Sequence, residues 1–410
     1  MTLAGAGPGR RMVVACNPVR VVRGSSLDEL AQAWAEARAA WNADIHVSGV
    51  PIGIGFLSYD LGRRFERIRG TRLLPSDWPD MEFRFFDAVV VGDAESGWAE
   101  IWASGESAAR GLAADILGAS EVLDEENPPA KFAPLAELDA SARHLEAVSR
   151  ALDYIHAGDI YQVNLARRLG CSLPSPPGQA PGLALFARLE SEAPAPHSIW
   201  FADGEAGTAL VGNSPECFLR QSTNGRIETW PIKGTRPRLA SDASNRNADV
   251  LVASAKDRAE HVMIVDLERS DLGRVCQTGS VKVEDLCRVL TLPTVHHLVT
   301  KVSGQLRPEV DLAGLLRATF PGGSVTGAPK IRAMEIIEEL EPARRGPYTG
   351  ATGWLGAAGD LDLAVAIRTA TIRESALTLW VGGGIVADSV PGEELAETWD
   401  KAQAFARVLG

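Results

Sequence analysis

The stretch Leu361–Val381, LDLAVAIRTATIRESALTLWV, holds two strand candidates, Leu361–Thr371 and Leu377–Val381, with only a short segment between them. Further strand candidates have the same apolar character and lie at Ile160–Leu165, Thr208–Gly212 and Arg226–Pro231. Strands that arrive in groups, rather than in strict alternation with helices, favour antiparallel sheets over a doubly wound parallel sheet. We therefore predict an α+β fold built on antiparallel sheets.

The predicted helices lie between and after these strands, at Ala142–His156, Ala248–Asp266 and Gly392–Val408. At about 100° per residue, the last helix places one set of residues on a predicted core face: Leu395, Trp399, Ala402, Ala406 and Leu409. Glu394, Glu397 and Lys401 share a different stripe of this helix. That stripe is either a solvated face with a Glu397–Lys401 pair or part of a binding site.

The composition is that of a soluble globular protein, with 410 residues of which 45% are hydrophobic and 23% charged. No apolar run approaches the length of a membrane helix, and none near Met1 resembles a signal peptide, so we expect a cytoplasmic protein without membrane contact. The net charge of −12 argues against a nucleic-acid partner, because phosphate binding needs clustered cations. The five scattered cysteines fit reduced thiols.

An acidic, proline-bearing segment, Glu121–Ala136, separates two compositional regimes. We expect an N-terminal region at 1–136 and a catalytic domain at 137–410. Within the second, Glu260 directly precedes an apolar turn of its helix. It is either paired with Arg258 or Lys256 or turned toward a cavity. Two helices that present carboxylates to one cavity would form a site for a cation such as Mg²⁺.

Two other features suggest a ligand. Val381–Ser389, VGGGIVADS, places three glycines after a strand, which allows close backbone approach to a ligand or marks a bulge. Arg368 is a charged residue inside an apolar strand candidate, and such residues are seldom buried without a partner. That partner is either a ligand carboxylate, which arginine binds bidentately, or a protein carboxylate.

Several of these segments occur in one order: GDIYQVNLARR, SPECF, PIKGTRPR, AKDRAEHVMIVDLERSDLGRV, VHHLVTKVSGQL, FPGGSVTGAPKIRAMEIIEELEP, GPYTGATGWLG, LAVAIRTATI and GGGIVADSVPGEELAETWDKA. From about Ala142 onward, the chain resembles the chorismate-utilising enzymes, which include component I of anthranilate synthase and of aminodeoxychorismate synthase, and the isochorismate and salicylate synthases. The resemblance implies antiparallel β-sheets packed together and surrounded by helices, as in anthranilate synthase component I. Tyr59–Glu66, YDLGRRFE, resembles the aminodeoxychorismate branch.

Two positions discriminate within this family. Lys233, in PIKGT, resembles the aminodeoxychorismate synthases, whereas anthranilate synthases have alanine there. Gln162 stands where the isochorismate-forming and salicylate-forming members have a lysine that activates water. Because an amide cannot act as a base, both positions favour amination through the aminodeoxychorismate route.

The resemblance also implies ligand contacts. Mg²⁺ would bridge a carboxylate of chorismate to Glu260 and Glu397, with Glu394 close by through water. Gln162 would lie in the substrate site, and Thr235 and His297 would line the substrate ring, with His297 counted among the catalytic group. The remaining substrate contacts would come from Tyr348, Arg368, Gly382, Gly383, Gly384 and Lys401.

For the chemistry, Glu216 matches a general acid at the C4 hydroxyl of chorismate, and Lys233 matches a proposed nucleophile at C2. Hydroxide is a poor leaving group and an amine must be neutral to attack, so Glu216 must be protonated and the pKa of Lys233 lowered. Ammonia would then displace the lysine and give 4-amino-4-deoxychorismate, a precursor of p-aminobenzoate and folate. This transaminase-type reaction implies ammonia from a separate glutamine amidotransferase subunit, in a heterodimer.

Two alternatives stay open. The first is anthranilate synthase component I, which makes anthranilate for tryptophan biosynthesis. The second is a non-catalytic subunit that only binds chorismate.

Overall fold

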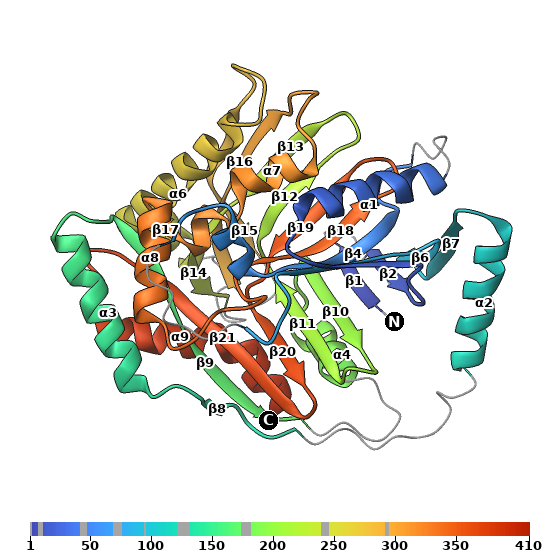
Figure 1. The fold of residues 1–410 in the computed structure, drawn as a ribbon. Coiled ribbons are helices and arrows are strands. Elements are labelled where there is room, and N and C mark those ends of the chain that lie inside the picture. Colours follow the sequence, from blue (N-terminus) through green and yellow to red (C-terminus); the bar gives the residue numbers. More distant parts are fainter. Residues whose placement is uncertain are drawn as a thin grey trace.

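The structure, a computed structural model, describes residues 2–6, 11–41, 47–68, 76–93, 96–120, 132–173, 182–238, 246–291 and 295–410. Most of the predicted boundary segment Glu121–Ala136 lies outside these residues. The described chain folds into two large sheets with helices around them (Figure 1). Neighbouring strands pair antiparallel throughout the assigned ladders, for example where β9 (Gln162–Ser172) pairs β21 (Ala376–Ile385). The predicted α+β class with antiparallel sheets is confirmed.

Eleven described strands form the first sheet: β1 Thr2–Ala6, β2 Arg11–Ala15, β6 Ala88–Asp93, β7 Trp98–Ala103, β8 Ala136–Glu137, β9 Gln162–Ser172, β10 His197–Asp203, β11 Thr208–Ser214, β17 Gly327–Ala328, β20 Thr369–Arg373 and β21 Ala376–Ile385. Their spatial order is β17-β9-β21-β20-β11-β10-β1-β2-β6-β7, and β8 pairs with β9. The central strands of this sheet therefore come from distant parts of the sequence.

Ten described strands form the second sheet: β3 Arg20–Gly24, β4 Pro51–Leu57, β5 Met81–Phe85, β12 Cys217–Gln221, β13 Arg226–Trp230, β14 Ile232–Pro237, β15 Lys282–Thr291, β16 Val295–Gln305, β18 Ala351–Gly356 and β19 Leu361–Val365. Their order is β14-β16-β13-β12-β19-β18-β4-β5-β3, and β15 pairs with β16. Strands from before residue 137 thus extend both sheets, and in the described residues they form no sheet of their own.

The described helices are α1 Leu27–Ala40, α2 Glu106–Ser120, α3 Ser141–His156, α4 Leu183–Glu192, α5 Arg246–Ala253, α6 Ala255–Gly273, α7 Leu312–Thr319, α8 Lys330–Leu340 and α9 Pro391–Leu409, with short 3₁₀ turns η1 Tyr59–Arg64 and η2 Gly323–Val325. The prediction of one helix at Ala248–Asp266 is wrong, because Ser254 ends α5 and caps α6 by accepting a hydrogen bond from the Asp257 amide. None of these described helices is long and apolar enough to cross a membrane.

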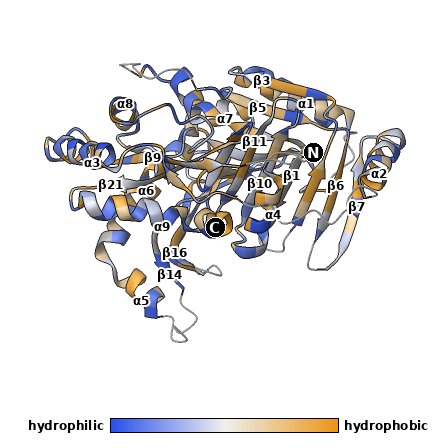
Figure 2. Ribbon diagram, turned by 90° about the horizontal axis from the view of Figure 1, so that it is seen from below, coloured by the Kyte–Doolittle hydropathy of each residue, from blue (hydrophilic) through white to orange (hydrophobic). Residues whose placement is uncertain are grey.

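The largest core lies between the two sheets. It combines residues of the first sheet, such as Ile199 and Phe201, with residues of the second, such as Phe56 and Leu363. Figure 2 shows hydrophobic residues gathered along the strands. A second core packs α4 and α9 against the first sheet, and a third packs α3 and α8 against β9.

The chain passes from one sheet to the other at two neighbouring places. Pro215 and Glu216 connect β11 to β12, and the segment Ala366–Arg368 connects β19 to β20. The Ser214 hydroxyl donates to the Val365 carbonyl at 2.6 Å, and the Val365 amide donates to the Glu216 carbonyl at 3.0 Å. The prediction of one strand at Leu361–Thr371 is therefore wrong. Strand β19 ends at Val365, and β20 begins at Thr369 after Arg368, whose left-handed φ of 49° is not an extended strand conformation.

Helix α9 lies against β21, and only part of the predicted core face, Ala402 and Leu409, is buried. Leu395 and Ala406 are only partly buried, and Trp399 is 36% exposed. The buried residues are Glu394, Thr398, Ala402, Phe405, Val408 and Leu409. The face is rotated because β21 presents glycines without side chains here, so the helix can turn its carboxylate stripe toward the strand.

Candidate active site

Lys233 and Gln162 meet beside the triple glycine of β21. Lys233 lies on β14, and Gln162 begins β9 and is completely buried. A methyl group built on Gly384 would lie 2.9 Å from Lys233 Nζ and 3.0 Å from Gln162 Nε2. Both amide atoms of Gln162 are buried without a hydrogen-bond partner among the described residues, so they are suited to contact a ligand.

The surroundings of Lys233 favour its neutral amine. Burial lowers the pKa of Lys233, and the charge of Lys401 lowers it further. The carboxylates of Glu260, Glu216 and Glu397 act in the opposite direction. Lys233 is half-buried, and the charges that act on it come from α6, α9 and a crossover between the sheets.

Glu216 lies at the first crossover and is 4% exposed. Burial raises the pKa of Glu216 to about 7, opposed by the Ser324 hydroxyl and then by the charge of Lys233. Its Oε1 atom is buried without a hydrogen-bond partner in the described part of the chain. A carboxyl group with this pKa can hold a proton near neutral pH and donate it to a leaving group.

Arg368 lies at the second crossover and is half-buried. Burial lowers the pKa of Arg368, opposed by the carboxylate of Glu216. No carboxylate lies within 4.0 Å of its guanidinium among the residues that the structure describes. An arginine without such an ion pair is free to bind a ligand carboxylate bidentately.

Three predicted residues of α9 converge on Gly383. A methyl group built on Gly383 would lie 3.2 Å from Glu394 Oε2, 3.5 Å from Glu397 Oε1 and 3.5 Å from Lys401 Nζ. Lys401 donates to the Gly382 carbonyl at 2.8 Å and pairs with Glu397 at 2.5 Å. The bare glycine therefore leaves the space into which these groups point.

Glu260 comes from a different helix, α6, and its charge acts on Lys233. Among the described residues, the carboxylate oxygens of Glu260, Glu394 and Glu397 do not all lie within 4.8 Å of one another. Carboxylate oxygens are nevertheless the ligands that Mg²⁺ takes, usually one or two from the protein with water and substrate in the other positions. Glu260, Glu394 and Glu397 thus supply donors of the type that such an ion takes, and two of them lie beside Gly383.

His297 and Thr235 pair across β14 and β16. His297 is 1% exposed, and its Nδ1 lies 3.3 Å from the Gly234 carbonyl. Burial, followed by the charge of Arg368, lowers the pKa of His297 to about 3, so the imidazole is neutral and Nδ1 carries the proton. The side chain of Thr235 lies outside what the structure describes.

Tyr348 lies in the loop between α8 and β18 and is buried. Its ring stacks on Trp380, with centroids 5.8 Å apart and planes 10° apart. Burial raises the pKa of Tyr348, so its hydroxyl stays protonated and can donate to a substrate carboxylate.

Two serines that received no role from the sequence also belong to this region. Ser389 donates to Glu394 Oε1 at 2.6 Å and fixes that carboxylate. Ser324 is 4% exposed, and its hydroxyl opposes the rise of the Glu216 pKa, although Oγ has no hydrogen-bond partner among the described residues. Both stand inside quoted motifs, but a serine beside glycine and proline is typical of an ordinary turn, so their role was not visible.

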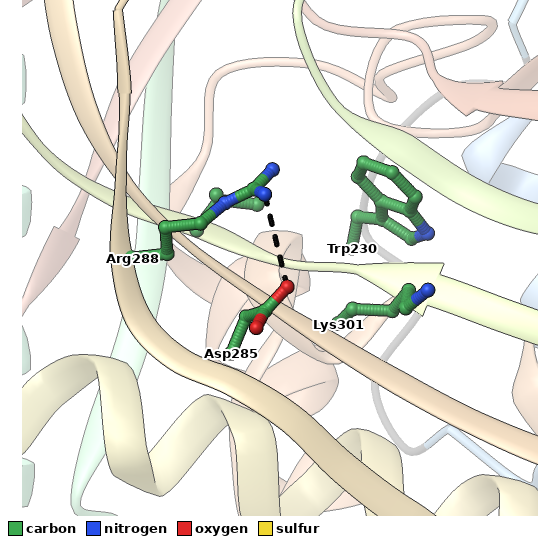
Figure 3. A pocket seen from close by; sticks show the side chains of 5 residues that line it. Trp230, Asp285, Arg288 and Lys301 are labelled. Atoms are coloured by element: carbon green, nitrogen blue, oxygen red, sulfur yellow. Dashed lines mark ion pairs between the residues drawn. The ribbon is translucent and has the colours of Figure 1, made fainter.

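Two other clusters consist of different side chains. His197, Cys217 and Asp362 place donor atoms within 4.8 Å of one another, but Asp362 already pairs with Arg220 at 2.7 Å. A separate hollow is lined by Trp230, Asp285, Arg288, Val299 and Lys301 (Figure 3). Its charged groups pair with one another or with neighbours, as in the Asp285–Arg288 contact at 3.7 Å.

Comparison with known proteins identifies the family. The model of the chorismate binding enzymes matches residues 2–407. The chain belongs to the chorismate-binding enzyme family. This member is 38% identical over 379 residues to aminodeoxychorismate synthase component 1 of Escherichia coli, which covers 92% of this chain and 80% of that protein. It is 37% identical over 358 residues to anthranilate synthase component 1 of Saccharolobus solfataricus, covering 87% of this chain and 80% of that protein.

A solved structure of the same family supports the fold. Anthranilate synthase component I from Streptococcus pneumoniae superposes with a TM-score of 0.80 at 30% identity, covering 98% of this chain and 93% of that one. The chorismate-binding enzyme described here therefore has the anthranilate synthase component I fold that its motifs predicted. Relatives of both the aminodeoxychorismate and the anthranilate type stand at similar identity, so overall similarity leaves the reaction open.

Proposed function

We propose that this enzyme is component I of aminodeoxychorismate synthase and converts chorismate and ammonia to 4-amino-4-deoxychorismate. The observation that supports this most is the position of Lys233, whose amine lies beside Gln162 and Gly384 and is influenced by the charges of the carboxylate groups. An amine with a lowered pKa in this place is suited to nucleophilic attack.

The proposed reaction consists of two allylic displacements. Lys233 Nζ forms a bond to C2 of chorismate while the C4–O bond breaks, and Glu216 gives its proton to the departing hydroxyl, which leaves as water. Ammonia then forms a bond to C4 while the bond between Lys233 and C2 breaks. The nitrogen gives up a proton that Glu216 can accept, so the acid is restored for the next cycle.

The other residues would hold the substrate. Arg368, the Tyr348 hydroxyl and Lys401 would bind its carboxylates, together with backbone amides of Gly382–Gly384. Gln162 and the neutral His297 would contact the ring. Glu260, Glu394 and Glu397 would hold Mg²⁺, which when bound neutralises a substrate carboxylate and withdraws electrons from the ring.

Ammonia would come from a separate glutamine amidotransferase subunit. The designation "component 1" of the similar E. coli protein indicates a second component in that system. We infer the same division of labour here, in a cytoplasmic heterodimer that serves p-aminobenzoate and folate biosynthesis.

The test is mass spectrometry of the product formed from chorismate, Mg²⁺ and an ammonium salt. We expect 4-amino-4-deoxychorismate, which retains the enolpyruvyl group, and no anthranilate fluorescence without an added lyase. Anthranilate as the main product would contradict the proposal. Adding a glutamine amidotransferase component with glutamine should then replace the ammonium salt.

Anthranilate synthase component I is the second candidate. It is favoured by anthranilate-type relatives of similar identity and by the Streptococcus pneumoniae structure. The same incubation separates the two, because anthranilate requires loss of pyruvate from the aminated intermediate.

A further inference from the structure

A buried ion pair, Glu341–Arg345, follows α8, and the exposed fractions of the two side chains are 2% and 1%. Arginine carries five N–H groups, and each of them donates here. Two go to Glu341, at 2.9 and 2.6 Å. The other acceptors are the Val325 carbonyl at 2.9 Å, the Thr349 hydroxyl at 3.0 Å and the Asn164 carbonyl at 2.8 Å.

These acceptors lie on three segments that each carry a residue of the candidate active site. Val325 follows Ser324, whose hydroxyl opposes the rise of the Glu216 pKa. Glu216 is also reached from Thr349, because the Thr349 amide donates to the Ala366 carbonyl and the neighbouring Val365 amide donates to the Glu216 carbonyl. Asn164 is two residues from Gln162 on β9 and pairs with Gly384. Thr349 directly follows Tyr348. The buried guanidinium of Arg345 therefore connects three segments: the one near Glu216, the one that carries Gln162, and the one that carries Tyr348.

The N-terminal region completes this arrangement. The ring of Tyr59 lies 4.5 Å from Arg345 Cζ, so the cation rests on an aromatic face. The Tyr59 amide donates to the Gly346 carbonyl at 2.8 Å, and Asp60 Oδ2 accepts from the Gly346 amide at 2.9 Å. Two residues of the motif Tyr59–Glu66 thus bind the backbone of Gly346, which directly follows Arg345.

Backbone strain points to the same place. Thr349 has a left-handed φ of 59°, which is costly for a β-branched residue and persists only when the surroundings hold it. Its hydroxyl is held by Arg345 and its amide by the Ala366 carbonyl at 2.9 Å. Ala366 opens the crossover that ends at the similarly strained Arg368.

We propose that Arg345, clamped by Glu341 and Tyr59, is a positioning residue that sets the mutual geometry of Glu216, Gln162 and Tyr348 for chorismate. It touches none of the reacting atoms and acts through the three segments that it joins. The inference rests on the proposed function only in using chorismate as the ligand.

The test compares Arg345→Lys with a matched control, Arg84→Lys. Arg84 is also buried and binds the carboxylate of Glu82 through two nitrogens, with Asp203 at 3.9 Å. It donates to a backbone carbonyl and lies on the ring of Phe201 at 4.1 Å. It contacts no residue of the candidate active site. Lysine keeps the charge at either position but has only three donors, so both variants should melt at lower temperature.

Chorismate consumption and calorimetric chorismate binding with Mg²⁺ are measured below both melting temperatures. We expect kcat/KM to fall about 100-fold in Arg345→Lys, with a displaced pH profile, and to stay within about twofold in Arg84→Lys, because misplacement of about 1 Å suffices for such a loss. An Arg345→Lys enzyme with parental kcat/KM and affinity, or an equal loss in Arg84→Lys, would overturn the inference.

Thr349→Ala provides a second, milder variant in case Arg345→Lys does not fold. It removes one acceptor of Arg345 and should lower kcat/KM about tenfold with little change in melting temperature, whereas parental kinetics would overturn the inference. Chorismate consumption and chorismate binding can be measured whatever the product is. Anthranilate formation by the parent enzyme would therefore refute the proposed function, while the kcat/KM ratios of variant to parent would still test the role of Arg345.

Discussion

At the scale of single residues, burial acts on Lys233 and Glu216 in opposite directions with one chemical result. It lowers the pKa of the amine and raises that of the carboxyl to about 7. Desolvation disfavours the charged form of either group. Burial therefore moves both groups toward the neutral amine and the protonated acid that the proposed displacement at C2 and C4 requires.

The first prediction concerns the pH profile. Glu216 works as a general acid only while protonated, so kcat/KM should decline as pH rises through about 7, the folded-state pKa of this group. Glu216→Gln should lower kcat/KM by roughly 10²- to 10⁴-fold and remove this limb. The measurement is initial chorismate consumption against pH. The same limb persisting in Glu216→Gln would assign it to another group.

The second prediction concerns the nucleophile. Lys233→Ala should slow formation of 4-amino-4-deoxychorismate by at least about tenfold, because the lysine amine can no longer attack C2. If ammonia attacks C2 in its place, the product should shift toward anthranilate. Lys301→Ala is the control. It removes the same type of side chain from the hollow of Figure 3, where Lys301 pairs with Glu284 at 3.1 Å. Equal rates and products in parent and Lys233→Ala would exclude the covalent route.

At the scale of elements, strand β21 and helix α9 form the substrate side of the candidate site together. The strand contributes no side chains at Gly382–Gly384, so the helix carboxylates and the amines of Lys233 and Lys401 approach the backbone closely. The third prediction follows from this space. Gly384→Ala should displace Lys233 or Gln162, because the new methyl group would lie 2.9–3.0 Å from them.

We expect kcat for Gly384→Ala to fall by roughly 10- to 100-fold, with near-parental melting temperature because the flexible lysine can move. Gly392→Ala at the start of α9 is the control, since a methyl group there meets nothing within 4 Å. Steady-state kinetics of both variants decides, and a Gly384→Ala enzyme as active as Gly392→Ala would contradict the close approach.

The elements also show what the sequence can predict. Antiparallel grouping of strands and helix α3 followed from local patterns. The buried face of α9 did not, because side-chain periodicity cannot show that the facing strand is bare. The crossover at Arg368 could not be predicted either, because it depends on contacts between distant parts of the chain. One of them is the hydrogen bond from Ser214 to Val365, 151 residues apart. Arg345 gives two of its five hydrogen bonds to backbone carbonyls of distant segments, and such contacts leave no sequence motif.

At the scale of the whole molecule, the N-terminal region and the rest of the chain share both sheets. Strands β4 and β19 both pair with β18, and Tyr59 and Asp60 hold the loop after α8. The candidate site residues could be named from the sequence because they lie in motifs that resemble the family. Composition alone suggested only a domain boundary near residue 136.

The fourth prediction is that this shared architecture unfolds as one unit. Hydrogen–deuterium exchange in rising denaturant should give the same midpoint for peptides from β4 and β19, because opening either strand breaks the sheet they share with β18. Exchange of the β4 peptides at clearly lower denaturant would show that the N-terminal region unfolds independently.

The most direct test of the account is a search for its covalent intermediate. The enzyme is mixed with chorismate and Mg²⁺ without ammonia, quenched rapidly, digested and analysed by mass spectrometry. The account predicts that the peptide containing Lys233 gains the mass of chorismate less one water, and that Lys233→Ala shows no such gain. An unmodified Lys233 peptide, under conditions where added ammonium yields 4-amino-4-deoxychorismate, would contradict it.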